Sequence, residues 1–391
     1  MARLGDLFLH IRNGANIKQG LDNTGYPITR IETISNRTVD RNKMGYAGIT
    51  DLEKYSDFVM QDGDILMSHI NSETHLGKTA LYEKEGDEII IHGMNLLSLR
   101  PNKDLITSKY AFYYLSSQSF LRQIPNITKK SVNQASFTVS ALKELAFPIP
   151  SIEEQKKITL DLDKVNDLIS LRKQQLSKLD ELVKSRFVEM FGDPVLNPYG
   201  WKTKPLLEMG NCKNGMNFHD GDEGIEINCL GVGDFKDLAM IDKTYELPTI
   251  SLNEAPPKEY LLKDGDIVFV RSNGNKALVG RCLVVYPHDT PTTYSGFCIR
   301  YRLTTNELET QYLLRVLKTE SVRKKMAGRG ANIQNLNQQI LASLIIPIPP
   351  KDLQQQFATF VEQTDKSKFE IQKSLEKLEI LKKALMQKYF G

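Results

Sequence analysis

The chain reads FPIPSIEEQ at residues 147–155, and a related stretch, IPIPPKDLQ, stands at residues 346–354. The two stretches lie 199 positions apart, and the same register continues without a gap to Phe191-Gly192 and Phe390-Gly391. The identities between these points are Gln155 with Gln354, Leu176 with Leu375, Leu179 with Leu378, and Leu182 with Leu381. A match that keeps one register over this length indicates a tandem repeat.

Upstream of these stretches the two halves diverge. DGDI at 62–65 returns at 264–267 and Asn13-Gly14 returns as Asn214-Gly215, so the offset drifts to about 202. The 391 residues also exceed what one hydrophobic core usually serves. We therefore expect four segments, which are a first module at 1–150, a helix at 151–191, a linker with a second module at 192–350, and a helix at 351–391.

Both helical segments carry an apolar stripe. In the first segment the apolar residues alternate between steps of three and four, in a pattern that skips Arg172 and Arg186. The second segment keeps the same phase but has a poorer seam, which contains Thr364, Lys368 and Lys382. The stripe residues are Leu162, Val165, Ile169, Leu176, Leu179 and Val183 in the first segment, and Ile371, Leu375, Leu378 and Leu385 in the second. This spacing predicts two long helices that pair through a heptad seam.

The expected fold is mixed α/β with a pseudo-twofold tandem repeat. Apolar runs at 65–67, 88–91, 267–270 and 281–285 predict strands, and 108–124 and 310–326 predict amphipathic helices. We expect two modules with curved sheets, separated by two long antiparallel helices that form an intramolecular coiled coil. At 1.5 Å per residue, 40 residues span about 60 Å, so the helices would be a rigid spacer.

The bulk composition is that of a soluble protein. No apolar run approaches the roughly 18 residues of a membrane span, and the start lacks the features of a signal peptide. The net charge is only +3, but six basic residues gather near the end of the second module, which fits a nucleic-acid surface or a solvated helix face. They are Arg315, Lys318, Arg323, Lys324, Lys325 and Arg329. The four cysteines form no CxxC pair and are expected to be free thiols.

Known catalytic and cofactor motifs are incomplete. Gly77-Lys78-Thr79 lacks the first glycine of a P-loop, and Asn197-Pro198-Tyr199 lacks the second proline of an amino-methyltransferase loop. Residues 231–233 read GVG, which a turn beside a strand explains better than a nucleotide site. The acidic pairs at 62–64 and 264–266 could bind Mg²⁺, but a turn that opens a strand explains them equally well. We predict no catalytic residue and no metal ligand.

Polar loops occupy matching places in both modules. One set follows the DGDI strand and the other follows the amphipathic helix. Arginine pairs with guanine, and asparagine or glutamine with adenine, in the major groove, while lysine suits phosphates. The candidate DNA contacts are Ser68, His69, Asn71, Lys78, Lys129, Lys130, Asn133, Gln134, Arg271, Ser272, Asn273, Asn275, Lys276, Arg329, Asn332, Gln334 and Asn335. An ordinary polar turn is the alternative for each loop.

These features together resemble the specificity subunit of type I restriction-modification systems. The resemblance rests on the repeated PIP element with a long helix after each copy, on FGDP and NPYGW in the link at 191–201, and on the two DGD-aliphatic strands. It covers essentially the whole chain. One departure is Leu353, where the first copy has Glu154.

The resemblance implies a non-catalytic, sequence-specific DNA-binding subunit of the prokaryotic cytoplasm. Each module would be a target-recognition domain that reads one part of a bipartite duplex target. The helices would set the spacing and dock two modification subunits, and restriction subunits would join the larger complex for host defence. S-adenosylmethionine, ATP and Mg²⁺ would bind to those partners and none of them to this chain.

Two other classes stay open at this point. A self-contained DNA methyltransferase or nuclease with atypical motifs would bind S-adenosylmethionine or turn over DNA as the purified chain. A structural coiled-coil adaptor would explain the two helices. It would not explain why the sequences of the two modules diverge while the helix sequences match in one repeat register.

Overall fold

The computed structural model describes residues 1–17, 20, 24–34, 37–130, 134–219, 221–235, 238–327 and 335–391. The chain divides into two compact units, and the boundary falls inside both long helices. Unit 1 comprises Met1–Lys173 with Lys373–Gly391, and unit 2 comprises Gln174–Gln372. Each unit therefore holds one module, the start of one helix and the end of the other. Within the described ranges no helix is long and apolar enough to cross a membrane.

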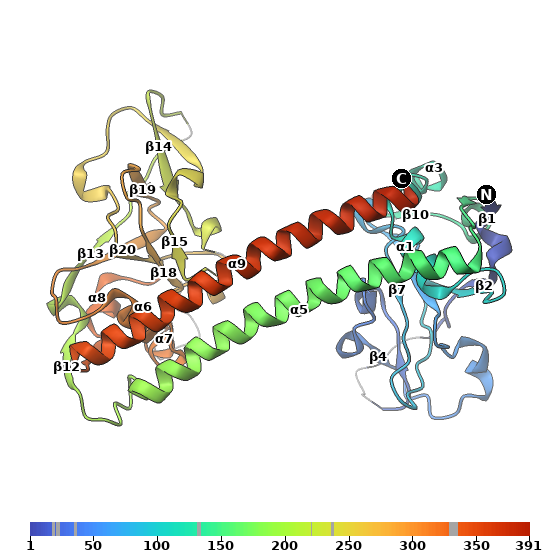
Figure 1. Ribbon diagram of the computed structural model, residues 1–391, viewed down its shortest axis with the longest axis horizontal. Coiled ribbons are helices and arrows are strands. Elements are labelled where there is room, and N and C mark those ends of the chain that lie inside the picture. Colours follow the sequence, from blue (N-terminus) through green and yellow to red (C-terminus); the bar gives the residue numbers. More distant parts are fainter. Residues whose placement is uncertain are drawn as a thin grey trace. The chain divides into compact units, whose positions relative to one another are not determined.

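Unit 1 is built on a four-stranded antiparallel sheet in the order β2-β8-β5-β7, formed by β2 (Phe8–Asn13), β5 (Ile65–Ser68), β7 (Thr79–Leu81) and β8 (Leu96–Pro101). A three-stranded sheet joins β6 (Ile70–Asn71), β10 (Ala135–Ser136) and β9 (Lys129–Lys130), and two short pairs join β1 (Ala2–Arg3) to β11 (Ala146–Phe147) and β3 (Pro27–Ile28) to β4 (Gly45–Tyr46). The module helices are α1 (Ser108–Leu115), α2 (Gln118–Leu121), α3 (Ile124–Ile127) and α4 (Val139–Lys143), and α1 packs on β7 (Figure 1).

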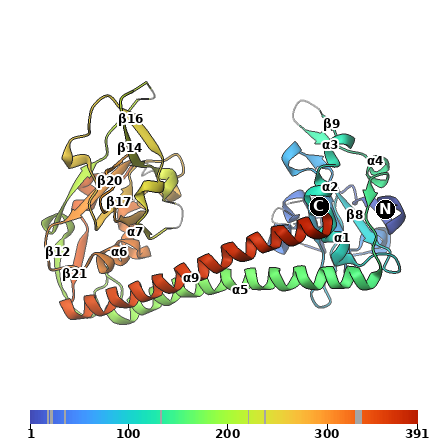
Figure 2. The ribbon, with the colours of Figure 1, turned by 45° about the horizontal axis from the view of Figure 1, so that its top comes forward.

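Unit 2 is built on a five-stranded sheet in the order β13-β20-β17-β18-β15, formed by β13 (Gly210–Asn214), β15 (Met240–Ile241), β17 (Asp266–Val270), β18 (Cys282–Val285) and β20 (Cys298–Leu303). A three-stranded sheet joins β16 (Thr249–Leu252), β14 (Ile225–Leu230) and β19 (Thr292–Tyr294). The module helices are α6 (Thr310–Lys318), which packs on β18, α7 (Glu320–Ala327) and α8 (Gln338–Ala342). Strand β12 (Lys202–Pro205) pairs with β21 (Ile345–Ile348), which leads into the second long helix (Figure 2).

The main sheets repeat one pairing scheme. Strand β5 lies between β8 and β7, as β17 lies between β20 and β18. A glycine turn opens the central strand in both units, with Gly63 at φ +90° and Gly265 at φ +84°, a region that favours glycine. The predicted mixed α/β class is confirmed, as are the strands predicted at 65–67, 267–270 and 281–285. The prediction of a strand at 88–91 is wrong, because Ile91 forms only isolated β-bridges there.

Each predicted amphipathic helix is broken. Residues 108–124 form α1, α2 and the start of α3, and Ser117 caps α2 by accepting a hydrogen bond from the Phe120 amide. Residues 310–326 form α6 and α7, which meet at Thr319 in an extended conformation with ψ 146°. Side-chain capping and local backbone geometry override an apolar period that continues through both breaks.

The two long helices are α5 (Ile152–Phe191) and α9 (Lys351–Phe390), each of 40 residues. A glutamine near each helix start is fully buried and ties the helix to its module. The Gln155 side chain accepts from the Thr107 amide at 2.8 Å, and that of Gln354 accepts from the Glu309 amide at 2.8 Å. The repeated glutamine therefore fixes how each helix leaves its module.

The end of each long helix closes the core of one unit. In unit 1, Phe390 of α9 lies against Tyr110 with ring centroids 5.5 Å apart. In unit 2, Phe191 of α5 lies against Tyr312 at 4.7 Å and against Phe357 of α9 at 5.5 Å. The repeated Phe-Gly endings thus occupy equivalent aromatic pockets.

Contacts between α5 and α9 occur within both units. In unit 1 the Tyr389 hydroxyl donates to Asp161 at 2.7 Å, and the Arg172 Nε donates to the Ser374 hydroxyl at 3.2 Å. In unit 2 Lys368 pairs with Asp180 at 2.6 Å. The predicted stripe residues are all buried or half-buried, namely Leu162, Val165, Ile169, Leu176, Leu179, Val183, Ile371, Leu375, Leu378 and Leu385. Each stripe residue is therefore at least partly covered by other parts of the chain.

Candidate nucleic-acid interface

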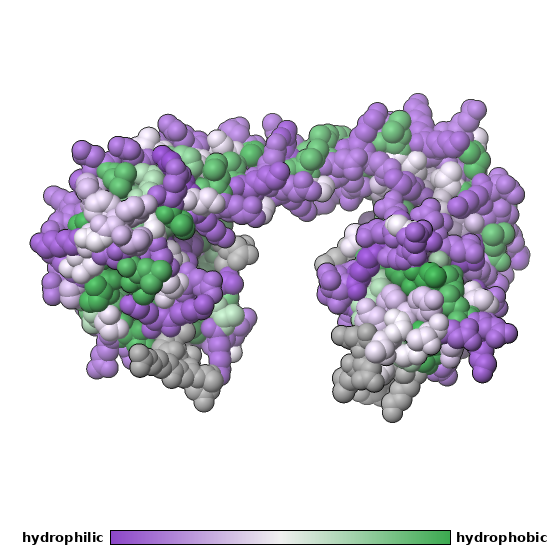
Figure 3. All heavy atoms as spheres, turned by 90° about the horizontal axis from the view of Figure 1, so that it is seen from below, coloured by the Kyte–Doolittle hydropathy of each residue, from purple (hydrophilic) through white to green (hydrophobic). Residues whose placement is uncertain are grey.

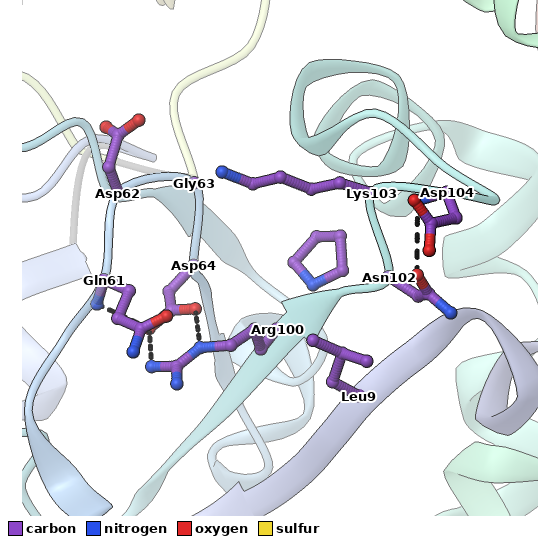
Figure 4. Close-up of a pocket in the computed structure, with 10 residues that line it drawn as sticks. Leu9, Gln61, Asp62, Gly63, Asp64, Arg100, Asn102, Lys103 and Asp104 are labelled. Atoms are coloured by element: carbon purple, nitrogen blue, oxygen red, sulfur yellow. Dashed lines mark hydrogen bonds and ion pairs between the residues drawn. The ribbon is translucent and has the colours of Figure 1, made fainter.

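The second aspartate of each DGDI turn ties two strands of the sheet together. Arg100 on β8 binds Asp64 through two hydrogen bonds of 2.8 Å, and Arg302 on β20 binds Asp266 through bonds of 2.8 and 2.7 Å. Both aspartates are 1% exposed. Figure 4 shows the Asp64–Arg100 pair at a cavity that Asp62 also lines. Since arginine occupies both oxygens of each buried carboxylate, these pairs anchor strands.

The cysteines and the possible metal-binding side chains were the other candidates for chemistry. That part contains no group of three His, Cys, Asp or Glu side chains placed to hold a metal. All four cysteines are free thiols, as predicted. Burial raises the pKa of Cys212 and Cys229 to about 12 and that of Cys282 to about 11, which opposes formation of a nucleophilic thiolate. GVG belongs to a short turn after β14, as predicted.

The two predicted polar sets of unit 1 come together in the sheet β6-β10-β9. Asn71 pairs with Ala135, and Ala135 pairs in turn with Lys130. Lys129, Lys130 and Gln134 are exposed, and Asn71 is half-buried. Lys130 also pairs with Glu73 at 2.6 Å. We name this three-stranded sheet the first candidate face.

Unit 2 joins its two polar sets in the same way. Ser272 forms an antiparallel bridge with Asn335, and the Leu336 amide donates to the Arg271 carbonyl at 2.8 Å. In unit 1 the Phe137 amide donates to the His69 carbonyl at 3.2 Å, so His69 and Arg271 hold equivalent places. We name the segment 271–276 with Asn335 the second candidate face.

Hydrogen bonds within unit 2 fix several side chains of the second candidate face. The Arg271 Nη1 donates to the Gly296 carbonyl at 3.2 Å and leaves other guanidinium donors for a ligand. The Asn273 side chain accepts from the Asn275 amide at 2.8 Å, and Asn275 caps the short helical turn at Lys276–Leu278. Asn275, Lys276 and Asn335 are exposed, and Arg271, Ser272 and Asn273 are half-buried. The loop thus presents ordered polar groups.

Four members of the predicted contact set, Asn133, Arg329, Asn332 and Gln334, lie outside the described residues. Two others are corrected, since Ser68 is 1% exposed and His69 is 7% exposed. Burial also lowers the pKa of His69 to about 4, so the ring is neutral at pH 7. We drop these two from the contact set. Lys78 is half-buried just before β7.

One exposed aromatic side chain was not anticipated. Phe297 is 63% exposed, and its carbonyl accepts hydrogen bonds from the amides of Arg271 at 2.8 Å and Ser272 at 3.2 Å. It therefore lies beside the second candidate face. An exposed phenyl ring suits the thymine methyl group or an unstacked base step. Only the strand pairing reveals this neighbour, because 26 positions separate Phe297 from Arg271.

Buried histidines distinguish unit 1 from unit 2. Burial lowers the pKa of His69 to about 4 and that of His92 to about 3, whereas His219 and His288 of unit 2 are exposed. An unfolded histidine takes up a proton near pH 6.5. The two buried rings take up none until the pH falls much further, so the unfolded state gains protons first as pH falls. Acid therefore destabilises unit 1 between pH 6.5 and about 4.

We expect a change from pH 7 to pH 5 to lower the stability of unit 1 by about 2 kcal/mol for each of these two histidines. Hydrogen exchange measured by mass spectrometry at both pH values follows the two units separately. Peptides of unit 1 should lose protection and those of unit 2 should keep it. Equal loss in both units would contradict the assignment.

Comparison with known proteins identifies the repeat. A protein-family model described as "Type I restriction modification DNA specificity domain" matches residues 1–181 and again residues 198–382. The chain belongs to this family. Each specificity domain therefore comprises one module and most of the long helix that follows it.

Relatives within the specificity family match along most of the chain. A putative type I restriction enzyme MjaX specificity subunit of Methanocaldococcus jannaschii is 30% identical, over 98% of this chain and 90% of its own length. The type I restriction enzyme StySPI specificity subunit of Salmonella potsdam is 24% identical, over 93% and 81%. The crystal structure of a type I restriction-modification S subunit from M. genitalium shares the fold, with a TM-score of 0.59 at 16% identity, and covers 100% of this chain and 95% of that one.

Proposed function

We propose that each specificity domain reads one half of a bipartite duplex DNA target through its candidate face. The observation that carries this proposal is the joining of two separate polar segments at the same structural place in both units. The side chains there differ between the units, which two unrelated half-site sequences would require. Asn71 and Gln134 would reach base edges in one half, and Arg271 and Asn273 in the other, while Lys129 and Lys130 would contact phosphates.

The helices α5 and α9 would act as an antiparallel coiled-coil spacer. Support comes from the burial of the heptad stripe and from three contacts between the helices. Asp161, Arg172 and Asp180 follow one another along α5. Their partners on α9 run in the opposite direction, from Tyr389 to Ser374 to Lys368. A rigid spacer fixes the half-site separation, as dimer geometry does in other DNA readers.

Two modification subunits would dock on the outer surfaces of these helices, and restriction subunits would join them. The stripe residues are buried or half-buried, and several more exposed apolar side chains lie outside the stripe. They are Leu168, Leu171, Leu182, Phe369, Ile380 and Leu381, each at least 44% exposed. Figure 3 shows hydrophobic patches of this kind among the hydrophilic side chains on the surface of each unit. The chain itself would neither methylate nor cut, and S-adenosylmethionine, ATP and Mg²⁺ would bind to the partners.

The test replaces one candidate base-contacting side chain at a time. In the complex reconstituted with its modification subunits, Arg271→Ala should weaken recognition of one half-site by about 1–3 kcal/mol, or roughly 5- to 150-fold. Binding to duplexes with substitutions confined to either half would show which half loses discrimination. The other half should keep its full selectivity. Loss of neither selectivity, or equal loss of both, would count against this face.

Lysine variants supply the matched contrast. Lys129→Ala should weaken binding to target and non-target duplexes alike and reduce the salt slope by about 1. Arg122→Ala, which removes an exposed arginine that belongs to neither face, should change neither quantity. A purified chain that methylates or cleaves DNA by itself would instead favour the self-contained enzyme.

A further inference from the structure

A cavity of about 780 Å³ lies in unit 2 between the end of α5 and the helices α6 and α7. Five of its lining residues are basic, namely Lys184, Arg281, Arg315, Lys318 and Arg323, and three are acidic, namely Asp180, Asp193 and Glu320. Neither Arg271 nor Asn335 lines it, so it is separate from the second candidate face.

Arg315 is the buried cation of this cavity. Its side chain is 8% exposed, and its Nε has no hydrogen-bond partner within the described ranges. Burial lowers the pKa of its guanidinium. A buried guanidinium with an unsatisfied N–H is costly unless an anion supplies the missing acceptor.

The nearby carboxylates are engaged elsewhere. Lys368 pairs with Asp180 at 2.6 Å and with Asp365 at 3.6 Å. Glu320 pairs with Lys324 at 2.7 Å, and the Asp193 side chain accepts from the amides of Val195 and Leu196 at 2.8 and 3.1 Å. The lining therefore keeps an excess of positive charge.

The equivalent place in unit 1 is neutral and satisfied. Tyr110 and Leu115 correspond to Tyr312 and Leu317 in the repeat, so Tyr113 corresponds to Arg315. The Tyr113 hydroxyl donates to Asp163 at 2.5 Å and accepts from the Asn166 side chain at 2.7 Å. A buried arginine whose Nε lacks a hydrogen-bond partner therefore belongs to unit 2 and is not required by the repeated fold.

We infer that this cavity binds the phosphate group of a phosphate ester. Arginine forks and lysine ammonium groups both suit phosphate oxygens, and Lys318 stands on the same helix and donates to the Leu238 carbonyl at 3.0 Å. Val188 and Leu238, 57% and 45% exposed, give the lining an apolar part that an organic body can contact. The phosphate can come from a free small molecule or from a DNA backbone. The inference stands independently of base reading by the candidate faces.

Calorimetric titration of the full chain tests the site with three probes, which are inorganic phosphate, adenosine 5′-monophosphate and a short duplex without a target sequence. Adenosine 5′-monophosphate should bind with one site per chain. Arg315→Met should weaken this binding about tenfold or more, and should raise the thermal stability of the ligand-free chain because it removes a buried charge. Arg186→Met, which replaces a half-buried arginine of α5 that does not line the cavity, should change neither.

The three probes distinguish a free small molecule from a DNA backbone as the source of the phosphate. Arg315-dependent binding of the free phosphates identifies a small-molecule site, and Arg315-dependent binding of the duplex alone identifies a backbone contact. If Arg315→Met does not fold, Lys318→Met must weaken binding by itself. Absence of saturable binding of all three probes, or binding that neither variant changes, would overturn the inference.

Discussion

Removal of one heptad from each long helix should abolish methylation of the natural target by the reconstituted complex. Deletion of 168–174 together with 374–380 takes out facing segments, since Arg172 contacts Ser374 and Lys173 contacts Glu379. Seven residues shorten the spacer by about 10 Å, close to three base pairs, and turn one half-site by about 100° about the duplex. Methylation should fall at least about 100-fold, because each half-site contributes several kcal/mol.

The control keeps the helix length. Lys173→Gln with Glu379→Gln removes one exposed ion pair, which is worth about 0–1 kcal/mol, and should leave the spacer requirement unchanged. Targets with spacers one to five base pairs shorter should be assayed beside the natural one. Full activity of the deletion variant on the natural spacer would refute the role of the helices as a ruler.

Replacement of Arg302 by methionine should unfold unit 2 under mild conditions. The change leaves Asp266 buried without its partner, which costs about 3–5 kcal/mol. Trp201 is the only tryptophan and lies in unit 2, so its fluorescence in a denaturant titration follows this unit. The midpoint should shift to lower denaturant concentration.

Two variants separate this cause from general damage. Arg100→Met breaks the matching pair in unit 1 and should leave the tryptophan transition in place. Asp266→Asn combined with Arg302→Met buries no unpaired charge and should recover part of the lost stability. A double variant less stable than the single one would show that the charge is not the cause.

The two long helices could be predicted from the sequence because the features that specify them lie within the helices or next to them. Prolines before each start, a stripe with heptad spacing and the repeated Phe-Gly endings predicted segments at 151–191 and 351–391, and α5 and α9 begin and end within one residue of them. The turn at Gly63 and Gly265 was readable for the same reason, since only a few backbone angles decide it.

The candidate faces depend on pairing between distant segments, which periodicity does not encode. Ile70 and Ser136 meet across 66 positions, so the sequence placed both polar sets in loops without bringing them together. The burial of Ser68 and His69 also depends on distant segments, because Ser68 pairs with Leu96 in the main sheet and His69 lies against Phe137. The sequence likewise did not predict that Phe297 is exposed beside Arg271.

The fit of Phe390 into unit 1 has a consequence for synthesis. The ribosome adds this ring after every residue of unit 2 has been made, because unit 2 is complete at Gln372. Domains usually fold in the order in which they emerge. Here unit 1, whose synthesis begins first, keeps its aromatic pocket at Tyr110 open until residues 373–391 have been made, so it is completed after unit 2.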